Sequence, residues 1–238
     1  MSSNNPLLIS RCFLSAIGTQ MFVHHQNRIP SEGPVLVASN HRSFMDAPIL
    51  MAAINRPIRF ACHRYMGQVP VLREIVTQLG CFPLEVPKKR QKGFFQKAVP
   101  LLQAREMVGI FPEGTSPMVR PTNPREVGAF HRGFAHLAFK APIADLAVLP
   151  VAIAAIDEAT YSPMPTKVLS LFDPSEPLFD QDGRHPVVIY RRVNVFIGRP
   201  YWITPRRRES YRGKKGKTIV SDLVDSFQAE IADLLRRG

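Results

Sequence analysis

The feature that most constrains the fold is an alternation of short apolar runs with amphipathic stretches. The apolar runs are Val35–Ser39, Ile58–Cys62, MVGIF from Met107 to Phe111, and LAVLPVAIAAI from Leu146 to Ile156. Parallel strands that are buried on both faces read as continuous apolar runs, and helices usually connect them. The alternation therefore predicts an α/β fold, a single domain with a mostly parallel central sheet flanked by helices.

Helical spacing of apolar residues fills the gaps between these runs. It predicts helices over residues 49–54, 69–80, 94–107 and 218–235, with Pro48 in the first turn of the first helix and Gly80 ending the second. Pro100 predicts a kink or a break in the third helix. The alternating segment RRVNVFIGRP, residues 191–200, predicts a further strand. A chain of 238 residues is long enough for one good hydrophobic core.

A polar pair, Asn40 and His41, follows the first apolar run directly, and Asp46 comes five positions after His41. Ligand sites of such sheets lie at the carboxyl ends of the strands, so we expect His41 at that edge. Asp46 lies two residues before Pro48, close to a helix N-terminus that favours a carboxylate. A carboxylate beside an imidazole fixes its tautomer and supports its positive charge.

The same segment lacks a protein nucleophile. The chain has no G-x-S-x-G motif, and no cysteine lies near this segment. The pair therefore suits a substrate hydroxyl that acts as nucleophile, with His41 as general base. The alternative is a capping aspartate and a hydrogen-bonded loop histidine.

A second polar cluster follows another predicted strand, in GIFPEGTSP from Gly109 to Pro117. Its members are Glu113, Gly114, Thr115 and Ser116. Exposed backbone N–H groups and two hydroxyls suit the binding of an anion or a polyol head. The alternative is an ordinary glycine turn with a capping hydroxyl.

Charge is concentrated near the C-terminus. The net charge is +12, and residues 184–217, with eleven Lys or Arg and one Glu, supply +10 of it. Such a region attracts nucleic acid, anionic lipid or an acidic carrier protein, or it is simply a solvated positive face. Because RRRESYRGKKGK lacks repeated aromatic residues and no helix-turn-helix or zinc-finger spacing occurs, we do not expect nucleic acid as a partner.

Metal and disulfide chemistry have little support in the sequence. Three widely spaced cysteines do not make a disulfide framework or a cysteine zinc site, and they fit a reducing compartment. The adjacent pair His24 and His25 has no obvious third ligand, so no metal is expected.

The N-terminal residues 1–29 are predicted to be an amphipathic, membrane-associating segment. Residues 6–23 contain polar interruptions that argue against a membrane span, and they lack the pattern of a signal peptide. We expect a cytoplasmic protein that is peripheral on the membrane, anchored by Leu7, Leu8, Phe13, Leu14, Ile17, Met21 and Phe22 and helped by the basic region. The alternative is a core helix. Residues 30–238 are predicted to form the remaining domain, with the basic region 184–217 and the final helix at its end.

Four blocks together indicate a family. Three of them are N-H-x4-D (Asn40, His41, Asp46), F-P-E-G-T (Phe111–Thr115) and the L-P-V strand (Leu149–Val151). The fourth, FHRGFAHLA from Phe130 to Ala138, lies between F-P-E-G-T and L-P-V. Over residues 30–200 the chain resembles the glycerolipid acyltransferases, that is, the lysophospholipid or 1-acylglycerol-3-phosphate acyltransferases. The resemblance implies the glycerol-3-phosphate acyltransferase-like fold. It also implies His41 as base, Asp46 as its partner, and Glu113 and Gly114 in the acceptor-binding block.

The resemblance further implies an activity: a fatty acyl group moves from acyl-CoA or acyl-carrier protein to a lysolipid hydroxyl, without metal or other cofactor. The expected acceptor is 1-acylglycerol 3-phosphate, which gives phosphatidic acid. The alternatives are acylation of a non-phosphorylated lysolipid or other alcohol, and an inactive basic membrane-binding module.

Two departures from the family pattern concern the phosphate of the acceptor. A further family block usually reads G-x-(I/F)-x-(I/V)-x-R, and here GCFPLEV keeps Gly80, Phe82 and Leu84 but has Val86 in place of the arginine. In the F-P-E-G-T block, Ser116 follows Thr115 where the family often has an arginine soon after. Arginine can bind a phosphate through two N–H donors at once. We therefore expect Arg90, which follows Lys88 and Lys89, to bind the phosphate in place of the missing arginine. The acyl donor, the chain length and the oligomeric state do not follow from the sequence.

Overall fold

A computed structural model describes residues 5–114, 116–119, 122–180, 182 and 184–238. Its strands are β1 (Gln20–His24), β2 (Val35–Ser39), β3 (Ile58–Cys62), β4 (Phe82–Pro83), β5 (Met107–Ile110), β6 (Leu146–Pro165), β7 (Arg184–Ile197) and β8 (Tyr201–Ile203). Its α-helices are α1 (Pro6–Ile17), α2 (Asp46–Ile54), α3 (Pro70–Gln78), α4 (Arg90–Gln103), α5 (Ser116–Val119), α6 (Gly133–Lys140), α7 (Lys167–Ser170), α8 (Pro205–Arg212) and α9 (Gly216–Arg237).

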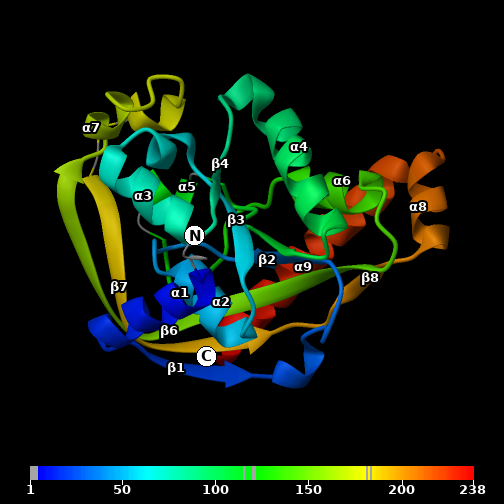
Figure 1. The fold of residues 1–238 in the computed structure, drawn as a ribbon, viewed down its shortest axis with the longest axis horizontal. Helices are drawn as coiled ribbons and strands as arrows, with labels where there is room; N and C mark the ends of the chain where they lie inside the picture. Colours follow the sequence, from blue (N-terminus) through cyan, green and yellow to red (C-terminus); the bar gives the residue numbers. More distant parts are fainter. Residues whose placement is uncertain (1–4, 115, 120–121, 181, 183) are drawn as a thin grey trace.

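One mixed sheet organises these elements (Figure 1). Its strand order is β1-β7-β6-β2-β5-β3-β4, and β8 pairs with β6 beyond the end of β7. The β6–β7 and β6–β8 pairs are antiparallel, whereas the other pairs among the described strands are parallel. The predicted α/β class with a mostly parallel sheet is confirmed.

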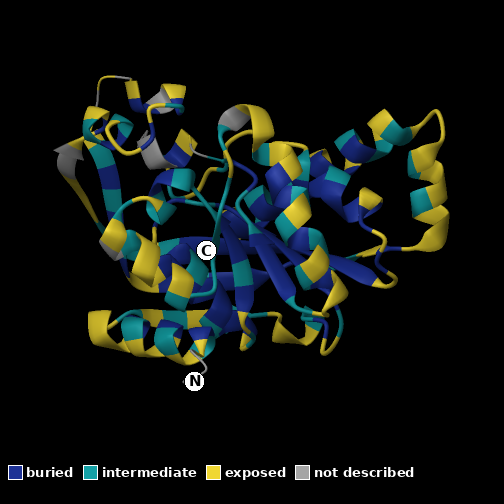
Figure 2. Cartoon of the chain, turned by 45° about the horizontal axis from the view of Figure 1, so that its top comes forward, coloured by how far each residue is buried: buried dark blue, intermediate teal, exposed yellow. Residues whose placement is uncertain are grey.

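Helices cover both faces of the sheet. Leu36 and Ala38 of β2 belong to a core shared with α4, α6 and α9, whereas Val35 and Val37 belong to a second core shared with α1 and α2. Successive side chains of a strand point to opposite faces, so a strand between two helical layers must be apolar throughout. Figure 2 shows the result, buried strands between helices that are exposed on their outer sides.

The predicted helix over residues 94–107 differs from the helix in the structure. Helix α4 begins earlier, at Arg90, and ends at Gln103, while Met107 begins β5 and pairs with both Val35 and Ile58. Pro100 lies inside α4 and does not end it. Because Pro100 and Gln96 are both exposed, the proline ring faces solvent and the carbonyl group of Gln96, which loses its usual N–H donor, can bind water.

Two parts of the chain extend the sheet beyond the prediction. Strands β6 and β7 form a long hairpin with register shifts near Ala155 and Tyr161, so β6 continues well past the predicted end at Ile156. Strand β1 lies within the N-terminal segment and pairs with β7, and Leu14 of α1 is buried in the core with α2. Helix α1 and strand β1 thus pack as part of the folded domain. No helix of the described residues is both long and apolar enough to cross a membrane.

Candidate active site

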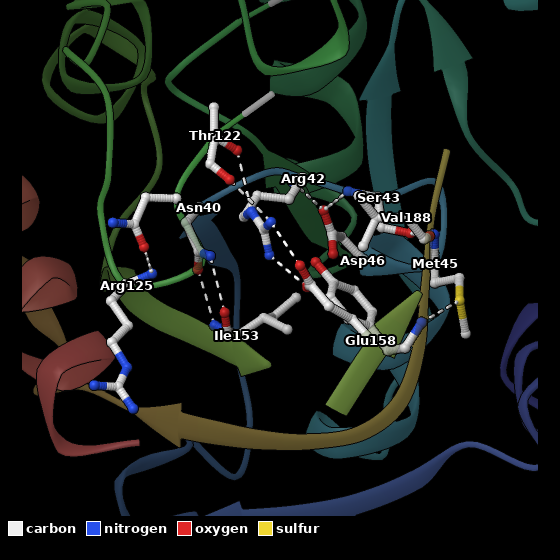
Figure 3. Close-up of polar contacts among 12 residues, drawn as sticks. Asn40, Arg42, Ser43, Met45, Asp46, Thr122, Arg125, Ile153, Glu158 and Val188 are labelled. Atoms are coloured by element: carbon white, nitrogen blue, oxygen red, sulfur yellow. Dashed lines mark hydrogen bonds and ion pairs between the residues drawn. The ribbon is translucent and has the colours of Figure 1, made fainter. Parts of the chain in front are cut away.

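Asn40 directly follows β2 and fixes the position of the residues after it. Its side-chain amide accepts a hydrogen bond from the N–H of Ile153 (2.8 Å) and donates one to the carbonyl oxygen of Ile153 (3.0 Å), as Figure 3 shows. The amide thus continues the ladder between β2 and β6 by one residue while the backbone turns away. This explains why an asparagine precedes His41.

His41 and Asp46 meet directly, as the sequence predicts. The imidazole Nδ1 lies 2.8 Å from Asp46 Oδ2, and the same oxygen accepts the backbone N–H groups of Arg42 and Ser43, each at 2.8 Å. Asp46 is the first residue of α2 and is almost fully buried, whereas the His41 side chain keeps 15% of its surface exposed. Because Asp46 occupies Nδ1, Nε2 is the ring nitrogen that can accept a proton.

Tyr190 faces the same carboxylate from β7. Its hydroxyl and Asp46 Oδ1 are both buried, and neither atom has a hydrogen-bond partner among the described residues. Burial, and then the negative charge of Asp46, raise the pKa of the Tyr190 phenol well above its ordinary value. The phenol therefore stays neutral beside the aspartate.

Arg42 anchors the loop between His41 and Asp46 (Figure 3). Its guanidinium forms two hydrogen bonds to the Glu158 carboxylate on β6, at 2.6 and 2.9 Å, and donates to the hydroxyl (3.1 Å) and the carbonyl (3.0 Å) of Thr122. Burial alone would lower the pKa of Arg42, but the contact with Glu158 raises it. Sequence reasoning missed this clamp, because nothing local links positions 42 and 158.

Phe111, at the end of β5, supports the imidazole from one side. The two rings are nearly parallel, with centroids 4.1 Å apart and an interplanar angle of 13°. The sequence placed Phe111 in a family block without indicating this contact.

Glu113, which follows β5, holds the same loop from the side opposite to β6. One carboxylate oxygen accepts the N–H of His41 (2.9 Å), and the other accepts the N–H of Gly128 (2.7 Å). Burial raises the pKa of Glu113, and the two backbone hydrogen bonds oppose that shift. The structure thus brings Glu113 next to His41, while its role in acceptor binding remains a prediction.

The other residues of this block lie around the same turn. Gly114 has a left-handed backbone (φ 67°), and a Cβ at this position would lie 3.1 Å from the imidazole of His131. Ser116 is exposed and begins α5. Thr115 falls outside the described residues.

Arg90, the expected phosphate ligand, is held by an acidic partner. Its Nη2 lies 2.8 Å from Glu176 Oε2, and the same oxygen lies 3.0 Å from Nε2 of His63, which directly follows β3. Burial alone would raise the pKa of Glu176, but Arg90 and then His63 lower it. Because β3 and β2 are separated by β5 alone, His63 follows its strand at the same edge of the sheet as His41, and the two strands are about 10 Å apart, which is two strand spacings.

The surface has two hollows of note. One, with a volume of about 180 Å³, borders Arg42 and Glu158 and is otherwise lined by Pro117, Thr122, Pro124, Thr160, Pro186 and Val188. The other, about 550 Å³, lies between residues 125–127 and α9, and neither His41 nor Asp46 is part of its lining. In the part of the chain that the structure describes, no three His, Cys, Asp or Glu side chains are grouped so that they could hold a metal ion.

Comparisons with known proteins show which sequences and structures this chain resembles. The sequence profile of the Acyltransferase family matches residues 20–154, a segment that contains His41, Asp46 and Glu113. The chain is 25% identical over 129 residues to the 1-acyl-sn-glycerol-3-phosphate acyltransferase LPAT1, a chloroplastic protein of Arabidopsis thaliana. That match covers 54% of this chain and 34% of the relative, so the chain spans about a third of the relative's length.

A solved structure shares the fold. It is the crystal structure of the 1-acyl-sn-glycerophosphate (LPA) acyltransferase PlsC from Thermotoga maritima, with a TM-score of 0.59 and 16% sequence identity. The match covers 96% of this chain and 78% of the other.

Proposed function

The chain belongs to the acyltransferase family, and on that premise we propose that it transfers a fatty acyl group to the free hydroxyl of a lysolipid. The proposed acceptor is 1-acylglycerol 3-phosphate, and the donor is the thioester of acyl-CoA or acyl-carrier protein. The observation that carries the proposal is the His41–Asp46 contact of 2.8 Å at the carboxyl end of β2, because it leaves Nε2 as the proton acceptor.

The proposed reaction makes use of this geometry. The acceptor hydroxyl gives its proton to Nε2 of His41 while its oxygen attacks the thioester carbonyl carbon, and Asp46 supports the resulting imidazolium. The tetrahedral intermediate then expels the thiolate, which takes the proton back from the imidazolium. The products are an ester and a free thiol, and His41 returns to its starting state.

His41→Ala tests the base. General base catalysis contributes roughly two to four orders of magnitude, so we expect kcat to fall about 100- to 10,000-fold without loss of the fold. Asp46→Asn should also be impaired, because it removes the negative charge and keeps the shape. His25→Asn is the matched control, since His25 is exposed and has a left-handed backbone (φ 61°) that asparagine tolerates.

The product should be identified by mass spectrometry, with a panel of lysolipids offered with each donor. A His41→Ala variant that keeps more than about a tenth of the wild-type rate would exclude His41 as the base, because that loss lies far below the range for general base catalysis.

Recognition of an acceptor phosphate is proposed for Arg90, which must then share or leave Glu176. A hydrogen bond to a charged group contributes about 1.5–3 kcal/mol, so Arg90→Ala should lower kcat/KM for 1-acylglycerol 3-phosphate roughly ten- to hundredfold. Monoacylglycerol, which has no phosphate, should be affected little. Glu176→Gln is the companion variant, because it frees Arg90 and should not lower kcat/KM for the phosphorylated acceptor.

A second acceptor class, a lysolipid without phosphate, is favoured by the pairing of Arg90 with Glu176 and by Val86 in place of the family arginine. If Arg90→Ala lowers kcat/KM equally for both acceptors, Arg90 supports the fold and does not bind the phosphate. No loss on either acceptor, in this variant or in Lys88→Ala and Lys89→Ala, would favour the second class.

Binding to a membrane surface is proposed for α1 and its neighbours. Leu8, Ile17 and Phe22 are exposed, whereas Leu14 is buried against α2. Phe13 of α1 contacts the exposed Phe44, whose centroid lies 6.1 Å away and which belongs to the loop between His41 and Asp46. This contact joins α1 to the loop that carries His41, where we propose that a lipid acceptor binds.

Liposome flotation tests this proposal. Deletion of residues 1–23 would remove β1 residues and uncover α2, so point variants are preferable. Leu8→Ser with Phe44→Ser should weaken binding, and Ile75→Ser, an equally exposed position on α3, is the control. Binding should strengthen with anionic lipid and weaken in high salt if the basic region contributes. Undiminished binding of the double variant would exclude this surface.

A further inference from the structure

A column of aromatic rings lies beneath the catalytic imidazole. His41 stacks on Phe111 at 4.1 Å, and Phe111 stacks on Phe60 at 5.2 Å with an interplanar angle of 11°. Phe60 lies on β3 and is 1% exposed. The column thus connects a surface histidine to a ring that is fixed in the core.

Gly109 forms the base of this column. It is the register partner of Phe60 across β3 and β5, and a Cβ at this position would lie 2.2 Å from Cε1 of Phe60. A glycine inside a strand is usually unfavourable, but here its missing side chain lets the Phe60 ring lie over the neighbouring strand. The glycine is therefore needed for the position of Phe60.

The column complements the hydrogen bond to Asp46. That bond fixes the position of one ring nitrogen, and the flat contact with Phe111 fixes the plane of the ring. Together they determine the direction of Nε2. The charged groups that face His41 are Asp46, at its Nδ1, and Glu113, which accepts its backbone N–H.

We infer that Phe111 and Phe60 are positioning residues that favour the protonated form of His41. The inference rests on the proposed role of His41 as general base. The face of an aromatic ring carries negative charge density and attracts a cation more than a neutral group. The imidazolium exists only once the acceptor hydroxyl has given up its proton, so the column stabilises the transition state more than the resting enzyme.

Phe111→Leu tests the inference because it keeps apolar bulk and removes the ring. A cation–π contact supports an expected fall in kcat of about 3- to 30-fold, with little change in KM for the acceptor. The acid limb of the pH profile of kcat should move to lower pH, because the imidazolium loses a stabilising partner. Phe111→Tyr keeps the ring and should retain most of the activity.

Gly109→Ala tests the base of the column through the position of the Phe60 ring. The added methyl group must displace the Phe60 ring, so the variant should shift kcat and the acid limb in the same direction as Phe111→Leu. Because both act through one contact, the double variant should lose less than the product of the two single losses. Phe95→Leu, which changes a partly buried ring of α4 outside the column, is the matched control.

A titration of the His41 imidazole by NMR separates this inference from the proposed reaction. In folded Phe111→Leu the imidazole should titrate at lower pH than in the wild type, whatever substrate the enzyme uses. An unchanged titration, or a fall in kcat with an unmoved acid limb, would overturn the inference. A shifted titration in a protein without acyl transfer would support the column and reject the proposed function.

Discussion

Replacement of Arg42 by methionine should destabilise the protein more than most single substitutions. Arg42 is 8% exposed, and its guanidinium donates to both oxygens of Glu158 and to two oxygens of Thr122. Removing one partner of a buried ion pair typically costs 3–5 kcal/mol, because the other charge stays buried without compensation. The Glu158 side chain keeps 19% of its surface exposed, so water can relieve part of that cost, and we expect about 3 kcal/mol.

Urea unfolding of Arg42→Met, Glu158→Gln and the double variant measures this effect. Glu158→Gln should cost at least as much, because it leaves the more buried guanidinium charged. The double variant should lose less than the two single losses together, with a coupling of about 0.5–3 kcal/mol. Single variants within about 1 kcal/mol of the wild type would refute the clamp as a buried ion pair, since breaking such a pair costs several times more. Strictly additive losses would also refute it.

The same variant should affect catalysis at temperatures where it is folded. The guanidinium of Arg42 holds the loop to β6, and the backbone N–H of the same residue donates a hydrogen bond to Asp46. Loosening the side chain therefore loosens the carboxylate that orients His41. Arg42→Lys keeps the charge but loses the planar fork, so its kcat should lie between those of the wild type and Arg42→Met.

Three further predictions follow from the same contacts. Asn40→Ala removes both hydrogen bonds to Ile153 and should lower the free energy of unfolding by about 1–3 kcal/mol, measured by urea. Glu113→Gln places an amide N–H₂ against one backbone N–H, so kcat should fall while KM for the acceptor stays the same; a raised KM with unchanged kcat would instead support acceptor binding. Burial lowers the pKa of His63, so the folded protein favours the neutral imidazole. The stability that this histidine contributes is therefore present above its ordinary pKa and is lost as the pH falls below that value. The free energy of unfolding should be smaller at pH 5.5 than at pH 7.5, and His63→Gln should reduce this difference.

The sequence predicts the local features of this site because they depend on neighbouring residues. Apolar runs gave the inner strands, and the short separation between His41 and Asp46 predicted their meeting at the start of a helix. Helix ends were less predictable. Met107 fits both the helical pattern before it and the apolar run after it, and pairing with Val35 and Ile58 places it in β5, because tertiary contacts outweigh helix propensity.

The partners that complete the site were not predictable, because they are distant in the chain. Glu158 reaches Arg42 across 116 positions, and Glu176 reaches Arg90 across 86. Both acidic residues lie on or near the β6–β7 hairpin, whose length exceeds the predicted strand. The pattern of a single sequence does not predict where such a hairpin lies relative to the rest of the sheet. It therefore does not predict which arginine forms an ion pair with an acidic residue of the hairpin.

The position of β2 within the sheet explains how a short loop can hold His41, the proposed base, in place. β2 lies between β6 and β5, so the loop after it has a neighbour on each side. From β6 it is held through Asn40 and Arg42, and from the end of β5 through Glu113. At an edge strand one of these sides would be solvent, and the loop would be more mobile. The proposed catalytic residues follow the central strand, where the backbone on both sides can fix an imidazole before a substrate binds.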